Sequence, residues 1–273
     1  MNPRVLVISQ DMPTDVSATP IILAISLKMY FSQQETIEWC RRISQISMIH
    51  PAASKNLVKL IVLPSSPSLG AVKSILQGAG VALGAQNLFH KDKGPYTGEV
   101  GGKMLSELGC SYVEIGHAER RQLFSETDEE VAEKLAAAVR NNLVPILCVG
   151  EQNHGTSKDS AQFCIDQIIS AVQVMHGAPT NLLVAYEPVW AIGAEKPASS
   201  QHIIEVSNLI SLYLDSSEQL AGSRVIYGGS AGPGLLTELE GEVAGLFLGR
   251  FGHDPENIIK ILDEVSATMP EFL

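Results

Sequence analysis

The chain has 273 residues, of which 45% are hydrophobic and 18% are charged, and its formal net charge at pH 7 is −11. This composition is typical of a globular protein with a large core. The acidic balance argues against a nucleic-acid or membrane partner, because both favour basic patches, and no apolar run approaches the ~20 residues of a membrane span.

Residues 1–20 are predicted to form an N-terminal extension, because a short apolar run is followed by the polar, proline-containing stretch DMPTDVSATP. From residue 21 onward, apolar runs of β type recur at intervals of roughly 20–40 residues. The first is IILAISL, and the others cover residues 57–64, 80–86, 111–117, 143–150, 182–187, 224–229 and 243–249. We interpret these runs as eight strands.

Segments with helical periodicity lie between the strands. The clearest is 128–142, which begins after a predicted capping box of Thr127 and Glu130. Others cover residues 32–47, 99–109, 158–177, 199–217 and 254–269. Repeated strand–helix units whose strands are apolar on both faces predict an α/β fold, a closed parallel (β/α)8 barrel, rather than an open sheet with weaker edge strands. Residues 21–273 are expected to form this single catalytic domain.

Four cysteines, Cys40, Cys110, Cys148 and Cys164, lie far apart with no CxxC spacing. Most of them fall in predicted helices or buried strands, so we expect free, buried thiols in a reducing compartment. The sequence contains no recognisable metal site and implies no cofactor. Free thiols in a reducing compartment lead us to expect a cytoplasmic location.

Polar residues follow several of the predicted strands. In a barrel of this kind the carboxyl ends of all strands face one common mouth. The residues expected there are Ser26 and Lys28 after the first strand, Gln86 and Asn87 after the third, His117 and Glu119 after the fourth, Glu151 after the fifth, Glu187 after the sixth, and the glycine clusters 227–234 and 248–252 after the last two. One cation, one imidazole, one carboxylate and two glycine-rich turns would therefore meet in one pocket.

The segment LVAYEPVWAIGAEKPA, residues 183–198, suggests a base beneath a movable lid. Its buried strand stops at Glu187, and a loop with rigid ends and a small-residue tip follows. The expected lid consists of Pro188, Val189, Trp190, Ala191, Ile192, Gly193, Ala194, Glu195, Lys196, Pro197 and Ala198. The alternative is a strand-end glutamate that only pairs with a nearby cation.

Each of the other features also has a structural alternative. Lys28 could be a solvated lysine, His117 a core histidine bonded to backbone, and YGGS (227–230) a tight turn. A phosphate, however, is held well by exposed backbone N–H groups, and barrels commonly place such a site after strands seven and eight. The joint pattern indicates an enzyme that acts on a small phosphorylated substrate.

These segments resemble a known family. AYEPVWAIG (185–193), GHAERR (116–121) and YGGS, together with GAQN (84–87), YTGE (96–99) and CVGE (148–151), are similar in order and spacing to the signature segments of triosephosphate isomerases. The resemblance runs from about residue 21 to the C-terminus. It implies the interconversion of dihydroxyacetone phosphate and glyceraldehyde 3-phosphate through an enediolate.

The resemblance also implies roles for individual residues. Glu187 would be the base, His117 the neutral electrophile, and Lys28 a source of positive potential that Glu119 orients. Substrate and phosphate would be bound by Ser26, Gly193, Gly228, Gly229, Ser230, Gly249 and Arg250. A homodimer is implied as well, with the loop around Thr97 inserted into a neighbouring subunit and Glu99 facing an arginine such as Arg120.

Six positions depart from the family pattern. Ser26 replaces an asparagine, Ala118 a serine, Ala194-Glu195 a threonine and glycine, Pro197 a threonine, and Arg250 a glycine. All lie around the substrate or in the lid, while Lys28, His117 and Glu187 are kept. Three hypotheses remain open: a triosephosphate isomerase, an isomerase of the same mechanism for a four-carbon tetrulose phosphate, and a non-catalytic barrel that senses sugar phosphate.

Overall fold

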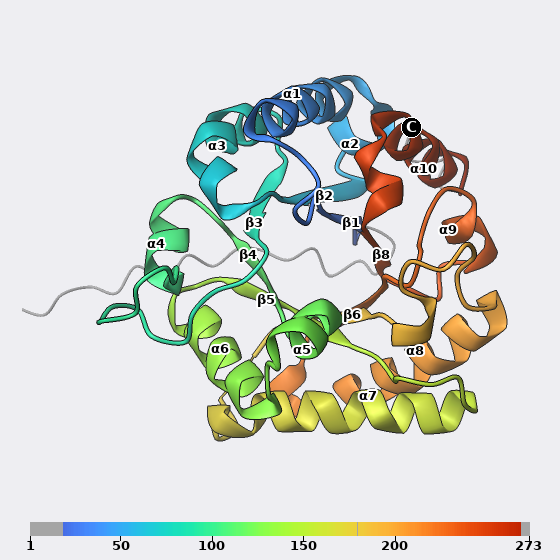
Figure 1. Cartoon of the computed structure of the whole chain (residues 1–273). Helices are drawn as coiled ribbons and strands as arrows, with labels where there is room; N and C mark the ends of the chain where they lie inside the picture. Colours follow the sequence, from blue (N-terminus) through green and yellow to red (C-terminus); the bar gives the residue numbers. More distant parts are fainter. Residues whose placement is uncertain (1–18, 179, 269–273) are drawn as a thin grey trace, which may run out of the picture.

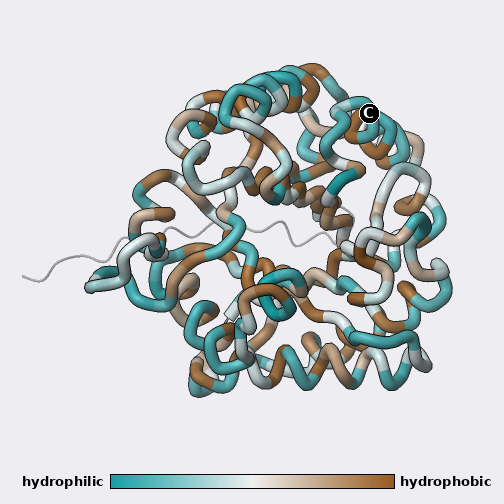
Figure 2. The backbone as a smooth tube through the Cα atoms, viewed as in Figure 1, coloured by the Kyte–Doolittle hydropathy of each residue, from teal (hydrophilic) through white to brown (hydrophobic). Residues whose placement is uncertain are grey.

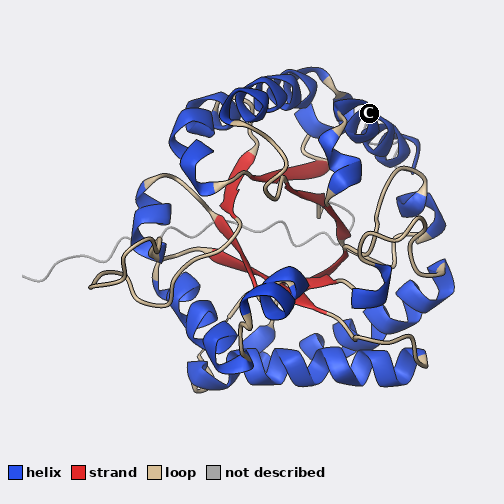
Figure 3. Ribbon diagram, viewed as in Figure 1, coloured by secondary structure: helices blue, strands red, loops and turns tan. Residues whose placement is uncertain are grey.

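The computed structural model describes residues 19–178 and 180–268. Eight parallel strands close into a barrel in sequence order, and helices form a ring around it (Figures 1 and 3). The strands are β1 (Ile21–Ser26), β2 (Val58–Leu63), β3 (Ala82–Ala85), β4 (Tyr112–Ile115), β5 (Val144–Val149), β6 (Leu183–Tyr186), β7 (Arg224–Tyr227) and β8 (Gly245–Leu248). The predicted fold class is therefore confirmed, and each strand is one to three residues shorter than its apolar run.

The helices connect successive strands on the outside of the barrel. They are α1 (Gln33–Ile49), α2 (Pro51–Ser54), α3 (Leu69–Gln77), α4 (Gly102–Glu107), α5 (Ala118–Phe124), α6 (Asp128–Arg140), α7 (Ser157–Val172), α8 (Ser200–Asp215), α9 (Leu235–Glu238) and α10 (Pro255–Thr268). Short 3₁₀ turns are η2 (Ser66–Ser68), η3 (Gln173–Met175), η4 (Val189–Ala191), η5 (Glu218–Leu220) and η6 (Arg250–His253). The last two residues of α1 lie beyond the predicted first helix, and α2, α3, α5 and α9 were not named from the sequence.

Local sequence signals explain where the long helices begin. The predicted capping box before α6 is present: Thr127 accepts from the Glu130 backbone, and the Glu130 carboxylate accepts from the Thr127 backbone. Ser32 and Glu35 form the same arrangement before α1. Each box satisfies two N–H groups that the first helical turn leaves without a partner.

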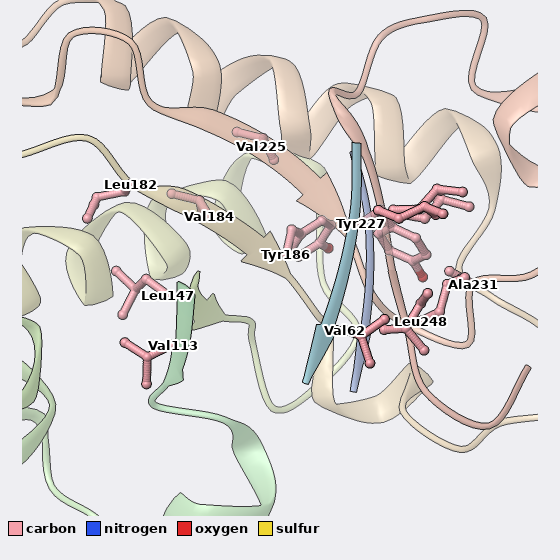
Figure 4. Close-up of a cluster of buried hydrophobic side chains, with 14 of the residues drawn as sticks. Val62, Val113, Leu147, Leu182, Val184, Tyr186, Val225, Tyr227, Ala231 and Leu248 are labelled. Atoms are coloured by element: carbon pink, nitrogen blue, oxygen red, sulfur yellow. The ribbon is translucent and has the colours of Figure 1, made fainter. Parts of the chain in front are cut away.

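Two apolar layers hold the barrel together. Side chains from alternate strand positions fill its interior, among them Ala24, Ile61 and Phe247. The positions between them pack outward against the helices, as Figure 4 shows for Val113, Leu147 and Val184. In Figure 2 the outer helices alternate between teal and brown segments, as expected where one face of each helix covers the barrel. All four cysteines are free and buried, as the sequence predicts.

The ends of the chain fall partly outside this description. The predicted N-terminal extension, residues 1–20, lies outside the described residues except for its last two positions. Among the described residues, no helix combines the length and apolar character needed to cross a membrane.

Candidate active site

Five of the polar residues predicted at the strand ends, Ser26, Lys28, His117, Glu119 and Glu187, meet at the carboxyl end of the barrel, whereas Gln86 and Asn87 border a second cavity and Glu151 borders neither. A cavity of about 220 Å³ lies there between the ends of β1, β4, β6, β7 and β8. The expected site residues on its wall are Ser26, Lys28, His117, Glu119, Glu187, Ile192, Gly193, Gly228, Ser230, Gly249 and Arg250. Gly229 does not border this cavity; a Cβ atom there would lie 2.5 Å from the Tyr227 hydroxyl.

Glu187 directly follows β6 and extends its carboxylate into the barrel mouth. The side chain is buried, and Oε2 has no hydrogen-bond partner among the described residues. A Cβ atom on Gly228 would lie only 2.5 Å from Glu187 Cγ, so this position has to be glycine for the carboxylate to fit. A buried carboxylate oxygen without a donor is costly to maintain and is free to accept a proton from a ligand.

His117 is held in one orientation by the start of α5. Its Nδ1 atom accepts a hydrogen bond of 3.1 Å from the Glu119 backbone N–H. Because Nδ1 accepts this bond, the N–H group that the ring can offer to the cavity is the one at Nε2. Nε2 points to the carboxylates of Glu187, at 3.5 Å, and Glu114, at 4.0 Å. The ring therefore offers one donor to the cavity.

Glu114 is a component of the site that sequence reasoning missed. It lies within β4, is buried, and accepts a 2.9 Å hydrogen bond from the Ser26 hydroxyl. Burial raises the pKa of its carboxyl to about 7; the Glu187 charge adds to this rise, and His117, the Ser26 hydrogen bond and Lys28 oppose it. The sequence feature that could have pointed to Glu114 is a single acid in an otherwise apolar strand, SYVEIGH.

Lys28 and Glu119 form an ion pair at the rim, with 2.5 Å between Nζ and Oε1. Burial acts to lower the pKa of Lys28, but the hydrogen bond and charge of Glu119, with smaller contributions from Glu187 and Glu114, raise it above the usual value. The ammonium group therefore stays charged. The Lys28 backbone has φ of +48°, a strained conformation for a residue with a Cβ atom, and such strain concentrates at functional sites.

The segment predicted to be the lid borders the cavity with Ile192 and Gly193 and is hydrogen-bonded along its length. Near its start, Trp190 Nε1 donates to Glu151 Oε1 at 2.8 Å. In the middle, the Ser230 hydroxyl lies 2.9 Å from the Ala191 carbonyl and 3.0 Å from the Ala194 carbonyl. At its end, the Ala198 backbone N–H donates to the Tyr227 hydroxyl at 3.1 Å.

These anchors were only partly visible in the sequence. Glu151 was noted as a strand-end residue without a role, and Tyr227 was read as part of a glycine turn. Both lie at strand ends, on β5 and β7, next to the strand that carries the lid. Their partners are far away along the chain, which is why periodicity alone could not find them.

Three comparisons with known proteins agree with this geometry. The sequence profile of the triosephosphate isomerase family matches residues 21–265. The chain is 47% identical over 251 residues to an L-erythrulose-1-phosphate isomerase from Pectobacterium atrosepticum, covering 91% of this chain and 97% of the relative. It is 36% identical over 247 residues to a triosephosphate isomerase from a Synechococcus species, covering 89% and 96%. In structure, it is similar to the triosephosphate isomerase of Bartonella henselae, with a TM-score of 0.73, 29% identity and coverage of 90% and 99%.

Proposed function

The chain belongs to the triosephosphate isomerase family and is an isomerase, and from this premise we propose that it moves a carbonyl group along a small sugar phosphate, with Glu187 as the base. Glu187 Oε2, which is buried and has no hydrogen-bond donor among the residues that the structure describes, removes a proton from the carbon next to the carbonyl. The His117 Nε2–H bond donates to the carbonyl oxygen as it becomes negative, and the Lys28 ammonium stabilises the same charge. Return of the proton to the neighbouring carbon completes the reaction.

The phosphate group is proposed to bind against Gly193, Gly228, Ser230 and the backbone N–H groups of Gly249 and Arg250. These residues border one side of the cavity. An enediolate with a phosphate on the adjacent carbon expels that phosphate readily in water, so the reaction requires a closed lid. The bonds from Glu151, Ser230 and Tyr227 to residues 188–198 support this closure.

We propose L-erythrulose 1-phosphate as the preferred substrate. It is dihydroxyacetone phosphate in which one hydrogen of the free hydroxymethyl carbon is replaced by CH₂OH, so the extra group points away from the phosphate. The same proton shift converts it to an erythrulose 4-phosphate. The observation that carries this choice is Ser26, a short side chain turned to Glu114 at a position where the family has an asparagine. The similarity to the Pectobacterium enzyme supports it.

Interconversion of the triose phosphates is the second candidate. It is favoured by the presence of Lys28, His117 and Glu187 in one cavity and by the triosephosphate isomerases among the relatives. The hypothesis of a non-catalytic sensor has no support from these relatives, which are named as isomerases.

The test is a steady-state assay of the pure protein on both substrates. We expect the value of kcat/KM for L-erythrulose 1-phosphate to exceed that for the triose phosphates, and the isomerised carbon to take up deuterium from D₂O. A protein that prefers the triose phosphates contradicts the substrate proposal. A protein that turns over neither, and exchanges no hydrogen, contradicts the proposed reaction itself.

We further propose that the protein acts as a cytoplasmic homodimer. Next to the active-site cavity lies a second cavity of about 440 Å³, whose wall includes Met29, Leu123 and Phe124. These side chains are 93%, 73% and 66% exposed, which is unusual for large apolar residues that cluster together. The loop of residues 86–101, which contains Thr97, extends away from the ring in Figure 1. The cavity and the loop suit a two-fold pair of subunits.

In this arrangement each Thr97 loop enters the partner's second cavity. Glu99 borders the second cavity together with Arg120 of the same chain and would face an arginine such as this one, whose Nε already donates to Glu126 at 2.6 Å and whose guanidinium lies over Phe124. Residues 21–273 are proposed to act as one catalytic domain, with residues 1–20 as an extension.

A further inference from the structure

Arg250 reaches across the mouth of the cavity to the tip of the lid. It is the first residue of η6, directly after β8, and its Nη2 atom donates a 3.0 Å hydrogen bond to the Gly193 carbonyl. A Cβ atom on Gly193 would lie 3.5 Å from the same Nη2 atom, so the guanidinium packs against the lid backbone. Arg250, which also borders the cavity, thus contacts the lid backbone directly.

Asp254, a nearby acid, makes a local contact instead of pairing with Arg250. Asp254 Oδ1 accepts a 3.0 Å hydrogen bond from the Glu256 backbone at the start of α10. Arg250 is therefore directed to the lid while the nearby acid caps a helix. The glycine that the family has at this position has no side chain with which to make such a bond.

This contact holds the tip of the lid, which lies between the residues that the other anchors hold. The other anchors hold the two ends and, through Ser230, the carbonyls of Ala191 and Ala194. The Ser230 hydroxyl has one hydrogen, so it can serve only one of those two carbonyls at a time. Gly193, between them, is held by a charged donor, and charge-assisted hydrogen bonds are the stronger class.

We propose that Arg250 is a positioning residue that latches the lid tip of this isomerase over the bound phosphate. The proposal rests on the proposed function, since it assigns the phosphate to the wall formed by Gly193, Ser230 and Gly249. The guanidinium has five N–H donors, and the bond to Gly193 uses one of them. A phosphate dianion beside the latch attracts the same guanidinium, so substrate binding and lid closure favour each other.

The latch has a chemical consequence that can be measured. If the tip lifts while the enediolate is present, the electron pair of its C=C bond shifts toward the phosphate-bearing carbon. The C–O bond to phosphate then breaks, and inorganic phosphate and an enol leave; no oxidant or reductant takes part. A loose lid should therefore divert turnovers from isomerisation to phosphate release.

The experiment compares Arg250→Met, Arg250→Lys and the control Arg41→Met, an exposed arginine on α1. Lid motion is followed without substrate by fluorine NMR of protein labelled with 5-fluorotryptophan. Trp190 reports the lid, and Trp39, buried on α1, serves as an internal reference. We expect Arg250→Met to broaden or split the Trp190 signal alone, to lower kcat/KM about tenfold, and to raise the fraction of turnovers that release phosphate.

The lysine variant separates the latch from a simple charge effect, because its ammonium keeps the charge but lacks the planar fork. We expect it to restore less than half of the loss. Full restoration by lysine, or an unchanged Trp190 signal in Arg250→Met, overturns the latch. Because the NMR measurement needs no turnover, it gives a result for the latch even if neither sugar phosphate is a substrate.

Discussion

His117 Nε2 and Glu187 Oε2 lie 3.5 Å apart at the carboxyl end of the barrel, one as a donor and the other as a buried acceptor without a hydrogen-bond partner among the described residues. The two groups come from β4 and β6 and face the same space. A carbonyl oxygen near the first and a C–H bond near the second is the geometry that enolisation needs. This relationship generates the first prediction.

Shortening the base should reduce turnover without loss of fold. Glu187→Asp withdraws the carboxylate by about one methylene, and a misplacement of about 1 Å can cost on the order of 10²-fold in rate. We expect kcat to fall by about that factor and the melting temperature to stay within the range of the control Glu195→Asp, an exposed lid residue. Wild-type turnover in Glu187→Ala would show that the base is a different residue.

Glu114 should make stability depend on pH. Its folded-state pKa is raised to about 7 from 4.5, so between these values the folded chain keeps a proton that the unfolded chain has lost. The free energy of unfolding therefore falls as pH rises through this window, by about 3 kcal/mol for this group, and is constant above it.

The measurement is chemical denaturation at pH 5 and pH 8. Glu114→Gln cannot ionise, so we expect its stability relative to wild type to increase between pH 5 and pH 8. Glu107→Gln, an exposed substitution on α4, serves as the control and should show no such difference. An equal pH dependence in wild type and Glu114→Gln would mean that Glu114 does not bind this proton.

The sequence predicted the strands and the residues at their ends because both follow from local patterns. Apolar runs end at or next to Ser26, His117 and Glu187, and parallel strands bring their carboxyl ends together. Glu114 was not predicted as a site residue, because a single acid inside an apolar strand leaves the apolar pattern of that strand recognisable. The direction of Arg250 was undetermined because its partner, Gly193, is 57 residues away in sequence. Helices α3 and α9 went unnamed because they are short, with nine and four residues.

The exposed apolar cluster should be an interface between subunits. We expect light scattering to give the mass of a dimer, and Leu123→Asp to shift it toward the monomer, because a carboxylate buried without a partner opposes association. Leu212→Asp is the matched control: Leu212 is 66% exposed on α8, and its substitution should leave the mass unchanged. A stable monomer of wild-type protein with full activity would contradict the prediction.

Ser26 should set the choice between three-carbon and four-carbon substrates. Its side chain is buried at the end of β1, borders the cavity and is bonded to Glu114. L-Erythrulose 1-phosphate needs room for one more CH₂OH group on the side away from the phosphate, and the longer amide of Ser26→Asn occupies space on that wall. Whether a pocket has room for a group of about this size changes the ratio of kcat/KM for two substrates by roughly 10- to 200-fold. We expect Ser26→Asn to lower kcat/KM for the tetrulose phosphate by a factor in this range and to change kcat/KM for the triose phosphates much less.

The control is Ser111→Asn, which lies just before β4 at the opposite end of the barrel and should leave the ratio of the two kcat/KM values unchanged. If Ser26→Asn also leaves the ratio unchanged, this wall does not select the substrate, and the triose phosphates become the better assignment.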